Sequence, residues 1–78
     1  MDNIKSLVQL SQGKKAIIKS INGGHGLIQR LDALGIRVGK EIEKVSTGIA
    51  HGPVVLRCGN TEVAIGFGMA QKVFVKEV

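Results

Sequence analysis

Short runs of β-branched and other aliphatic residues, separated by glycine-containing turns, are the feature that most constrains the fold of this chain. Runs of this length, bounded by turn residues, are typical of strands in small all-β domains. Five of them fit within 78 residues, and they span 14–21, 41–45, 54–58, 61–65 and 72–78. We therefore expect a small barrel of about five strands, because a barrel hides the sheet edges that an open sheet would expose.

Two local signals refine the expected strands. Gly59-Asn60 separates two of the runs, and such a pair is typical of a two-residue hairpin turn because both residues tolerate positive φ. In the run 41–45, Val45 breaks the alternation of polar and apolar residues. This break predicts a bulge or a strong twist near Lys44.

One segment has helical rather than strand periodicity. Leucines recur at helical spacing within 27–34, which predicts one amphipathic α-helix of about ten residues inserted after the first strand. Asn22 is placed to cap or turn the start of this helix, and Gly35 is placed to end it. The glycine-broken segment 66–71 suits a short helical turn before the last strand. The expected fold is thus mainly β with one inserted helix.

The length of the chain implies a single domain spanning 1–78 with a thin core, because so short a chain buries only about 60% of its unfolded surface. Cys58 is the one cysteine and cannot form an internal disulfide. The start MDNIKSLVQL is charged and does not resemble a signal peptide. The longest uncharged apolar run, 63–70, is less than half of the roughly 18 residues that a membrane helix needs. These features predict a cytosolic domain that does not insert into a membrane.

The net charge of +5 raises nucleic acid or an acidic surface as a partner. The basic residues are dispersed instead of clustered, which favours a solvated surface with no ligand. Small barrels that bind single-stranded nucleic acid usually stack bases on aromatic residues, and this chain has only two phenylalanines, with no Trp or Tyr. Nucleic-acid binding therefore stays a weaker alternative. The lysines counted among these solvated positions are Lys5, Lys14, Lys15, Lys19, Lys40, Lys44, Lys72 and Lys76.

The candidate metal ligands with nitrogen or sulfur atoms are His25, His51 and Cys58. No pair has the spacing of a known metal motif, and three ligands cannot close a structural zinc site. No serine or cysteine shows a local pairing with histidine that would indicate a nucleophile. The sequence therefore predicts no enzyme and no cofactor held by this chain alone. A weak site for a divalent transition metal, or a site shared with a partner, stays open.

Some apolar and basic residues exceed what a core needs. The inserted helix either covers one end of the barrel or docks a partner, and the loop around Ile49-Ala50 is apolar without an obvious structural reason. Basic side chains near the helix could meet an acidic partner. The candidate partner-binding residues are Leu27, Arg30, Leu34, Arg37, Ile49 and Ala50.

The order of these motifs resembles the FeoA family. The resemblance covers residues 7–76, and its most specific part is the turn Leu34-Gly35-Ile36-x-x-Gly39 followed downstream by Gly52-Pro53. Other matching stretches are Leu7-x-x-Leu10-x-x-Gly13, Ala16-x-Ile18-x-x-Ile21, Gly23-Gly24, Val63-Ala64-Ile65 and Ala70-x-x-Val73-x-Val75. One departure is Gly66, where relatives commonly carry a basic residue.

The resemblance implies a barrel like that of SH3 domains and an accessory role in bacterial ferrous iron uptake. The implied partner is the FeoB-like membrane ferrous iron permease, which has a cytosolic G domain, so the protein would lie in the cytoplasm, peripheral to the inner membrane. The fold also resembles the C-terminal domain of iron-dependent repressors, which keeps a metal-sensing domain as an alternative. Self-association into a homo-oligomer is compatible with a thin core and open strand edges.

Overall fold

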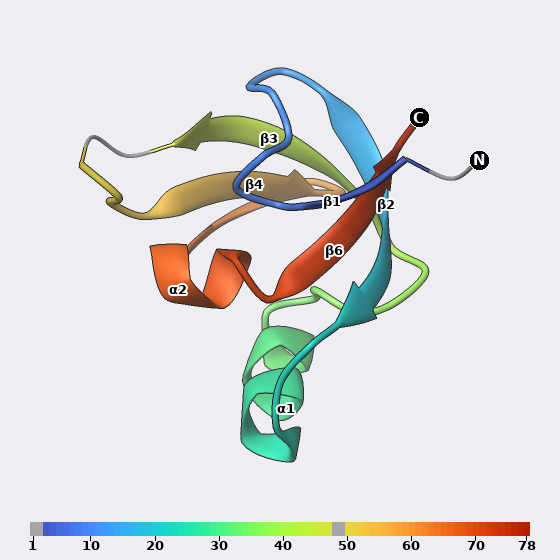
Figure 1. The fold of residues 1–78 in the computed structure, drawn as a ribbon, viewed down its shortest axis with the longest axis vertical. Helices are drawn as coiled ribbons and strands as arrows, with labels where there is room; N and C mark the ends of the chain where they lie inside the picture. The colour runs from blue at the N-terminus through green and yellow to red at the C-terminus, as the bar shows by residue number, and fades with distance from the viewer. Residues whose placement is uncertain (1–2, 48–49) are drawn as a thin grey trace.

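Six antiparallel strands form one curled sheet in the computed structural model, which describes residues 3–47 and 50–78 (Figure 1). The strand order across the sheet is β1-β6-β2-β3-β4-β5. The elements are β1 (Ile4–Ser6), β2 (Lys15–Ile21), α1 (His25–Ala33), β3 (Glu41–Thr47), β4 (Val54–Cys58), β5 (Thr61–Ile65), α2 (Phe67–Ala70) and β6 (Val73–Glu77). The expectation of a mainly β fold with an inserted helix and a short helical turn before the last strand is confirmed.

The strand that sequence reasoning missed is β1. It has three residues and pairs with β6, with Ile4 opposite Lys76 and Ser6 opposite Phe74. So short a run contains no alternation long enough to read as a strand. The sheet therefore has six strands where about five were expected.

The core follows the alternation of the central strands. Ala16 and Ile18 of β2 and Val73 and Val75 of β6 are fully buried, as the period of two predicts for a sheet with one covered face. Leu31 is the buried residue of α1. The remaining buried apolar side chains are Leu7, Leu10, Ile36, Ile42, Val54, Leu56, Cys58, Ile65 and Ala70.

Lys44 lies in this core, so the expectation that it belongs to a solvated surface is wrong. Its side chain is 2% exposed. The ammonium Nζ donates hydrogen bonds to the carbonyl oxygens of Val8, at 3.0 Å, and Leu10, at 2.7 Å. Burial without these bonds would be costly for a charged group, and the bonds tie the turn after β1 to β3.

The expected bulge and hairpin are both present. The register between β3 and β4 shifts between Lys44 and Ser46, where the bulge was predicted. Gly59-Asn60 forms the two-residue turn between β4 and β5, with Cys58 opposite Thr61. Only Gly59 has a positive φ, of 63°, which is the pattern of a type II′ turn.

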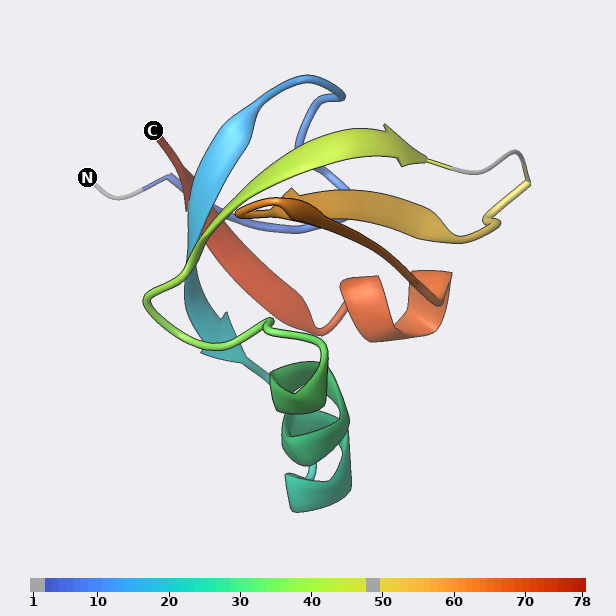
Figure 2. The ribbon, with the colours of Figure 1, turned by 180° about the vertical axis from the view of Figure 1, so that it is seen from behind.

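The ends of α1 were predicted with mixed success. The N-cap is Gly24 and makes no side-chain hydrogen bond, so the expectation that Asn22 caps the helix is wrong. The main-chain N–H of Asn22 donates to the carbonyl of Lys72 at 2.7 Å instead. Gly35 ends the helix as expected, with a φ of 86° that favours glycine. Two opposite views show α1 extending away from one end of the sheet, while α2 sits in the connection between β5 and β6 (Figures 1 and 2).

Candidate docking site

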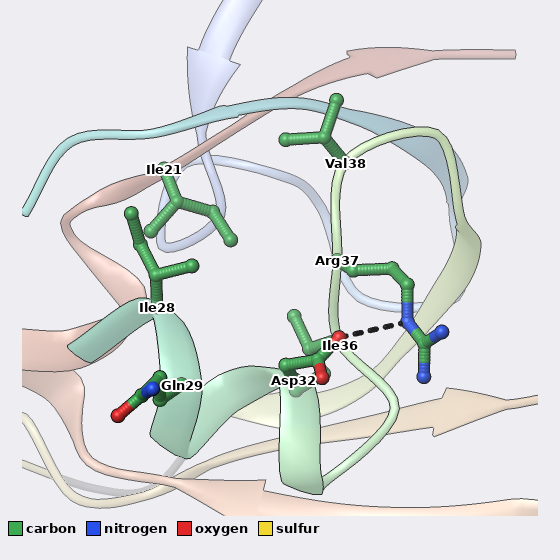
Figure 3. Close-up of a pocket in the computed structure, with 7 residues that line it drawn as sticks. All are labelled: Ile21, Ile28, Gln29, Asp32, Ile36, Arg37 and Val38. Atoms are coloured by element: carbon green, nitrogen blue, oxygen red, sulfur yellow. Dashed lines mark ion pairs between the residues drawn. The ribbon is translucent and has the colours of Figure 1, made fainter. Parts of the chain in front are cut away.

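A groove runs between α1 and the loop that joins α1 to β3 (Figure 3). Its volume is about 410 Å³, which falls within the range of small ligand sites. Most of its lining is aliphatic, and two of its walls reach solvent, because Ile28 is 40% and Val38 59% exposed. We call this feature the α1 groove; its lining residues are Ile21, Ile28, Gln29, Asp32, Ile36, Arg37 and Val38.

The loop side of the α1 groove is held in place by two glycines and two main-chain hydrogen bonds. Gly35 and Gly39 have φ values of 86° and 93°. These two glycines flank residues 36–38, which form a tight loop. The N–H of Gly39 donates to the carbonyl of Ile18 at 2.8 Å, and the N–H of Ile18 donates to the carbonyl of Lys40 at 2.9 Å. The loop is therefore anchored to β2.

Within this loop one side chain points into the core and the two that follow it are exposed. Ile36 is completely buried and contributes to both the core and the floor of the groove. Arg37 and Val38 are exposed. The buried isoleucine thus fixes the position from which its two neighbours project.

One ion pair borders the groove. Arg37 Nε lies 3.1 Å from Asp32 Oδ1, and the two side chains are 60% and 56% exposed (Figure 3). Exposed pairs of this kind contribute at most about 1 kcal/mol to stability. Either charge can therefore exchange its present contact for one with a partner at little cost to the fold.

The four candidate partner-binding residues in and just after α1 lie on different sides of this region. Leu27 is half-buried and packs against the core, so it anchors the helix. Leu34 is 39% exposed and Arg30 is exposed, but neither lines the groove. Arg37 does line it. The structure thus places one of these four predicted residues in the α1 groove.

Sequence reasoning missed the aliphatic walls of the groove. Ile28 lies next to the stripe formed by Leu27, Leu31 and Leu34, so the sequence does not distinguish it from the core-facing side of the helix. Val38 lies in a loop between Gly35 and Gly39, where the sequence has neither helical nor strand periodicity. The one available signal was that an isoleucine beside an already complete leucine stripe widens the apolar face beyond what the core can cover.

The loop between β3 and β4 contained two further candidates. Ile49 lies outside the described residues. Ala50 is exposed and has a φ of 53°. The next residue, His51, has a φ of 63°, and its ring stacks on Phe67 of α2, with centroids 4.4 Å apart and an angle of 21° between planes. This contact holds the end of the loop against α2.

The structure keeps the three candidate metal ligands in different settings. His25 is the exposed first residue of α1, and His51 is occupied in the stack on Phe67. Cys58 is buried, with Sγ 3.4 Å from the carbonyl oxygen of Gly35. Within residues 3–47 and 50–78, no three His, Cys, Asp or Glu side chains are grouped so that they could hold a metal ion.

A second hollow, of about 250 Å³, lies on the outer face of the sheet and is lined mainly by charged residues. Arg57 lies 2.5 Å from Glu62 Oε2 and 3.7 Å from Glu43 Oε1. The hydrogen bond and the charge of Glu62 raise the pKa of Arg57 above its ordinary value. Arg57 thus pairs with Glu43 and Glu62, as expected for a solvated sheet face.

In the part of the chain that the structure describes, neither helix is long and apolar enough to cross a membrane.

Comparison with known proteins was made on sequence and on structure. The FeoA domain model matches residues 5–77. A protein of Methanocaldococcus jannaschii, provisionally named Fe(2+) transport protein A, is 33% identical over 66 residues, which are 85% of this chain and 78% of that protein.

Solved structures agree with the sequence comparison. The crystal structure of an iron uptake regulatory protein, FeoA, has a TM-score of 0.87 and 31% identity, and covers 96% of this chain and 97% of that one. A manganese-dependent transcriptional repressor has a TM-score of 0.90 over all of this chain but 44% of its own, at 14% identity. The latter likeness shows the SH3-like fold alone. With the family model covering nearly the whole sequence, the chain belongs to the FeoA domain family.

Proposed function

We propose that this chain is a non-enzymatic accessory protein of ferrous iron uptake that binds the cytosolic part of a FeoB-like membrane permease and supports its transport. Membership of the FeoA domain family supports the link to iron transport, and so do the names of two relatives at 31% and 33% identity. The protein would act in the cytoplasm, at the inner membrane through its partner.

The observation that carries the docking part of the proposal is the α1 groove. Aliphatic side chains that are half-exposed on an anchored loop and helix gain free energy when a partner covers them. At about 25 cal/mol per Å² of apolar surface removed from water, covering Ile28 and Val38 would contribute roughly 1 kcal/mol each. Together the two contacts would approach the roughly 2 kcal/mol that marks an interface hot spot.

Charge around the α1 groove supports an acidic partner surface. Arg37, in the loop after α1, borders the groove and its ion pair with Asp32 is solvent-exposed, while Arg30 is exposed on α1 itself. The chain carries a net charge of +5. Complementary charge at the rim of an interface mainly increases the association rate and orients the partner. We therefore expect carboxylates on the permease next to an apolar side chain that enters the groove.

The test is binding of this chain to the purified cytosolic domain of the permease, with the affinity measured by isothermal titration calorimetry or surface plasmon resonance. Ile28→Asp and Val38→Asp place a charge in the groove and should each weaken binding about tenfold or more, the equivalent of about 1.4 kcal/mol. The matched control is Val78→Asp, because Val78 is 65% exposed at the chain end away from α1 (Figure 1). Equal affinity of all three variants and wild type would remove the α1 groove from the interface.

Two alternative functions have less support. A nucleic-acid-binding barrel is suggested only by charge, and the exposed lysines are spread over several strands and loops. A titration with generic DNA or RNA should show negligible binding, whereas a real binder would lose affinity steeply between about 50 and 200 mM salt.

A metal-sensing domain is suggested by the repressor structures, whose 14% identity shows the fold alone. Titration of Fe²⁺ or Zn²⁺ against wild type and the His25→Ala/His51→Ala double variant addresses it. Equal, weak affinity in both forms is the expected result. Tight binding that the double variant loses would revive the sensing function.

A further inference from the structure

Strand β5 is an outer strand of the sheet with an unpaired side. Its one neighbour in the strand order is β4. Among the described residues, no main-chain hydrogen bond joins residues 61–65 to any segment other than β4. Figure 2 shows this strand running along the near side of the molecule between the β4 hairpin and α2. Unpaired edges of this kind are templates for a further strand.

The hairpin register determines which groups of β5 are free. The turn Cys58–Thr61 is closed by main-chain hydrogen bonding between its first and last residues, and antiparallel pairs alternate from there between bonded and non-bonded. Thr61, Val63 and Ile65 therefore direct their N–H and C=O groups towards β4. Glu62 and Ala64 direct theirs outwards, to the open side. Both are exposed.

This edge lacks the usual protection against pairing. The sequence of β5 is TEVAI, which contains no proline and no lysine. Its register with β4 runs without a bulge from Val54–Ile65 to Cys58–Thr61. The one charged residue, Glu62, is already neutralised by Arg57 on β4, at 2.5 Å. Natural proteins normally block an exposed edge with at least one of these devices.

The free groups are arranged so that β5 is complementary to itself. If a second copy approaches antiparallel with a two-fold axis at Val63, Glu62 of one copy faces Ala64 of the other. These two residues carry the outward-pointing groups, so the two symmetric pairs form four intermolecular hydrogen bonds. A two-fold axis at Glu62 would instead place two like charges opposite each other, which is destabilising.

The side chains also fit this register. Val63 meets its own copy at the non-bonded position, where the Cα atoms of an antiparallel pair approach to about 4.5 Å. An aliphatic pair at such a position stabilises a sheet. The two Glu62 carboxylates are diagonal to one another, and each keeps its own Arg57. No charge is left buried or unpaired.

We propose that two copies of this chain associate through β5, antiparallel about Val63, to form a continuous sheet across a symmetric dimer. A five-residue edge buries little surface, so the dimer is weak and belongs with transient interfaces. None of the residues that line the α1 groove belongs to β4 or β5, so variants in β5 test the dimer separately from permease binding.

Concentration-dependent amide exchange tests the proposal residue by residue. Raising the concentration of the isolated chain from about 20 μM to about 1 mM, a range suited to weak complexes, should slow exchange of the Glu62 and Ala64 amides. The amides of Thr61, Val63 and Ile65 are the internal control, because β4 protects them at every concentration. Unchanged exchange at Glu62 and Ala64 over this range, with sedimentation as a monomer, would overturn the proposal.

Ala64→Pro is the matched variant. The substitution removes a donor that the isolated fold does not use, and proline is tolerated on an edge strand, so the variant should remain folded and lose the dimer. If the Ala64→Pro variant still dimerises as strongly as wild type, the dimer forms through another surface. Protection of β5 by the permease domain but not by concentration would assign the edge to the permease, and would equally overturn the proposal.

Cross-linking gives a positive readout that does not depend on loss of binding. In a Cys58→Ala background, Val63→Cys should oxidise to a disulfide-linked dimer, because Cα atoms about 4.5 Å apart are within disulfide range. Ala64→Cys in the same background faces Glu62 of the other copy and should stay monomeric. Equal cross-linking at both positions would contradict the two-fold axis at Val63.

Discussion

Replacing Lys44 by methionine tests the most unusual feature of the core. Methionine keeps an unbranched side chain of similar length and removes the ammonium, so the carbonyl oxygens of Val8 and Leu10 lose the donor that lies at 3.0 and 2.7 Å. A buried acceptor left without a partner costs about 1–3 kcal/mol. The same change removes the cost of burying a charge, which offsets part of the loss.

The net expected effect is a destabilisation of about 2 kcal/mol. A domain of this size has a total stability of roughly 4–12 kcal/mol, so the loss is a substantial part of it. It should lower Tm by about 8–16 °C. Far-UV circular dichroism is the suitable signal, because the chain has no Trp or Tyr for fluorescence. Lys40→Met is the control, since Lys40 is exposed, and it should shift Tm little.

The same substitution should also change how the free energy of unfolding depends on pH. Burial lowers the pKa of Lys44 below its ordinary value, so between the lowered and the ordinary pKa the unfolded state binds more protons than the folded state. The free energy of unfolding therefore rises with pH across that window and falls as pH drops through the lowered pKa. Lys44→Met should lack this alkaline rise. A variant as stable as wild type at neutral pH would refute the reasoning that the two carbonyl bonds hold the β1–β2 turn.

Three further substitutions test two glycines and one histidine. Gly35→Ala forces an alanine to a φ of 86° and should cost about 1 kcal/mol in chemical denaturation; no loss would contradict the assigned helix end. Gly26→Ala lies inside α1, where an added Cβ meets no atom within 4 Å, and should stabilise by about 0.5–1 kcal/mol; a loss would indicate that this helix position is crowded. His51→Ala removes the stack on Phe67 and should shift the NMR resonances of the Phe67 ring. Unshifted resonances would mean that the stack is not populated in solution.

Most of the fold could be predicted because its signals are local. The runs 54–58 and 61–65 with Gly59-Asn60 between them specify a hairpin without reference to the rest of the chain, and the bulge near Lys44 is visible as a break in alternation. The strand β1 could not be found in the same way. Three residues carry no periodicity, and β1 exists because β6 supplies its pairing partners from 68 or more positions away.

The candidate docking site was harder to predict, for a related reason. The α1 groove joins Ile21 from β2, Ile28 from α1 and Val38 from the loop, and no spacing in the sequence brings these three together. The burial of Lys44 likewise depends on two carbonyl groups more than 30 residues away. Side-chain type alone placed it with the solvated lysines. What the sequence lacked was the tertiary arrangement that gives these residues their neighbours.

The most direct test of docking through the α1 groove is an NMR titration of the isotope-labelled chain with the cytosolic domain of the permease. We expect the largest shift changes at Ile21, Ile28 and Val38, with the Arg37 side chain exchanging its contact with Asp32. Shift changes confined to the strands away from α1, or none at concentrations where the permease is saturated, would contradict this account.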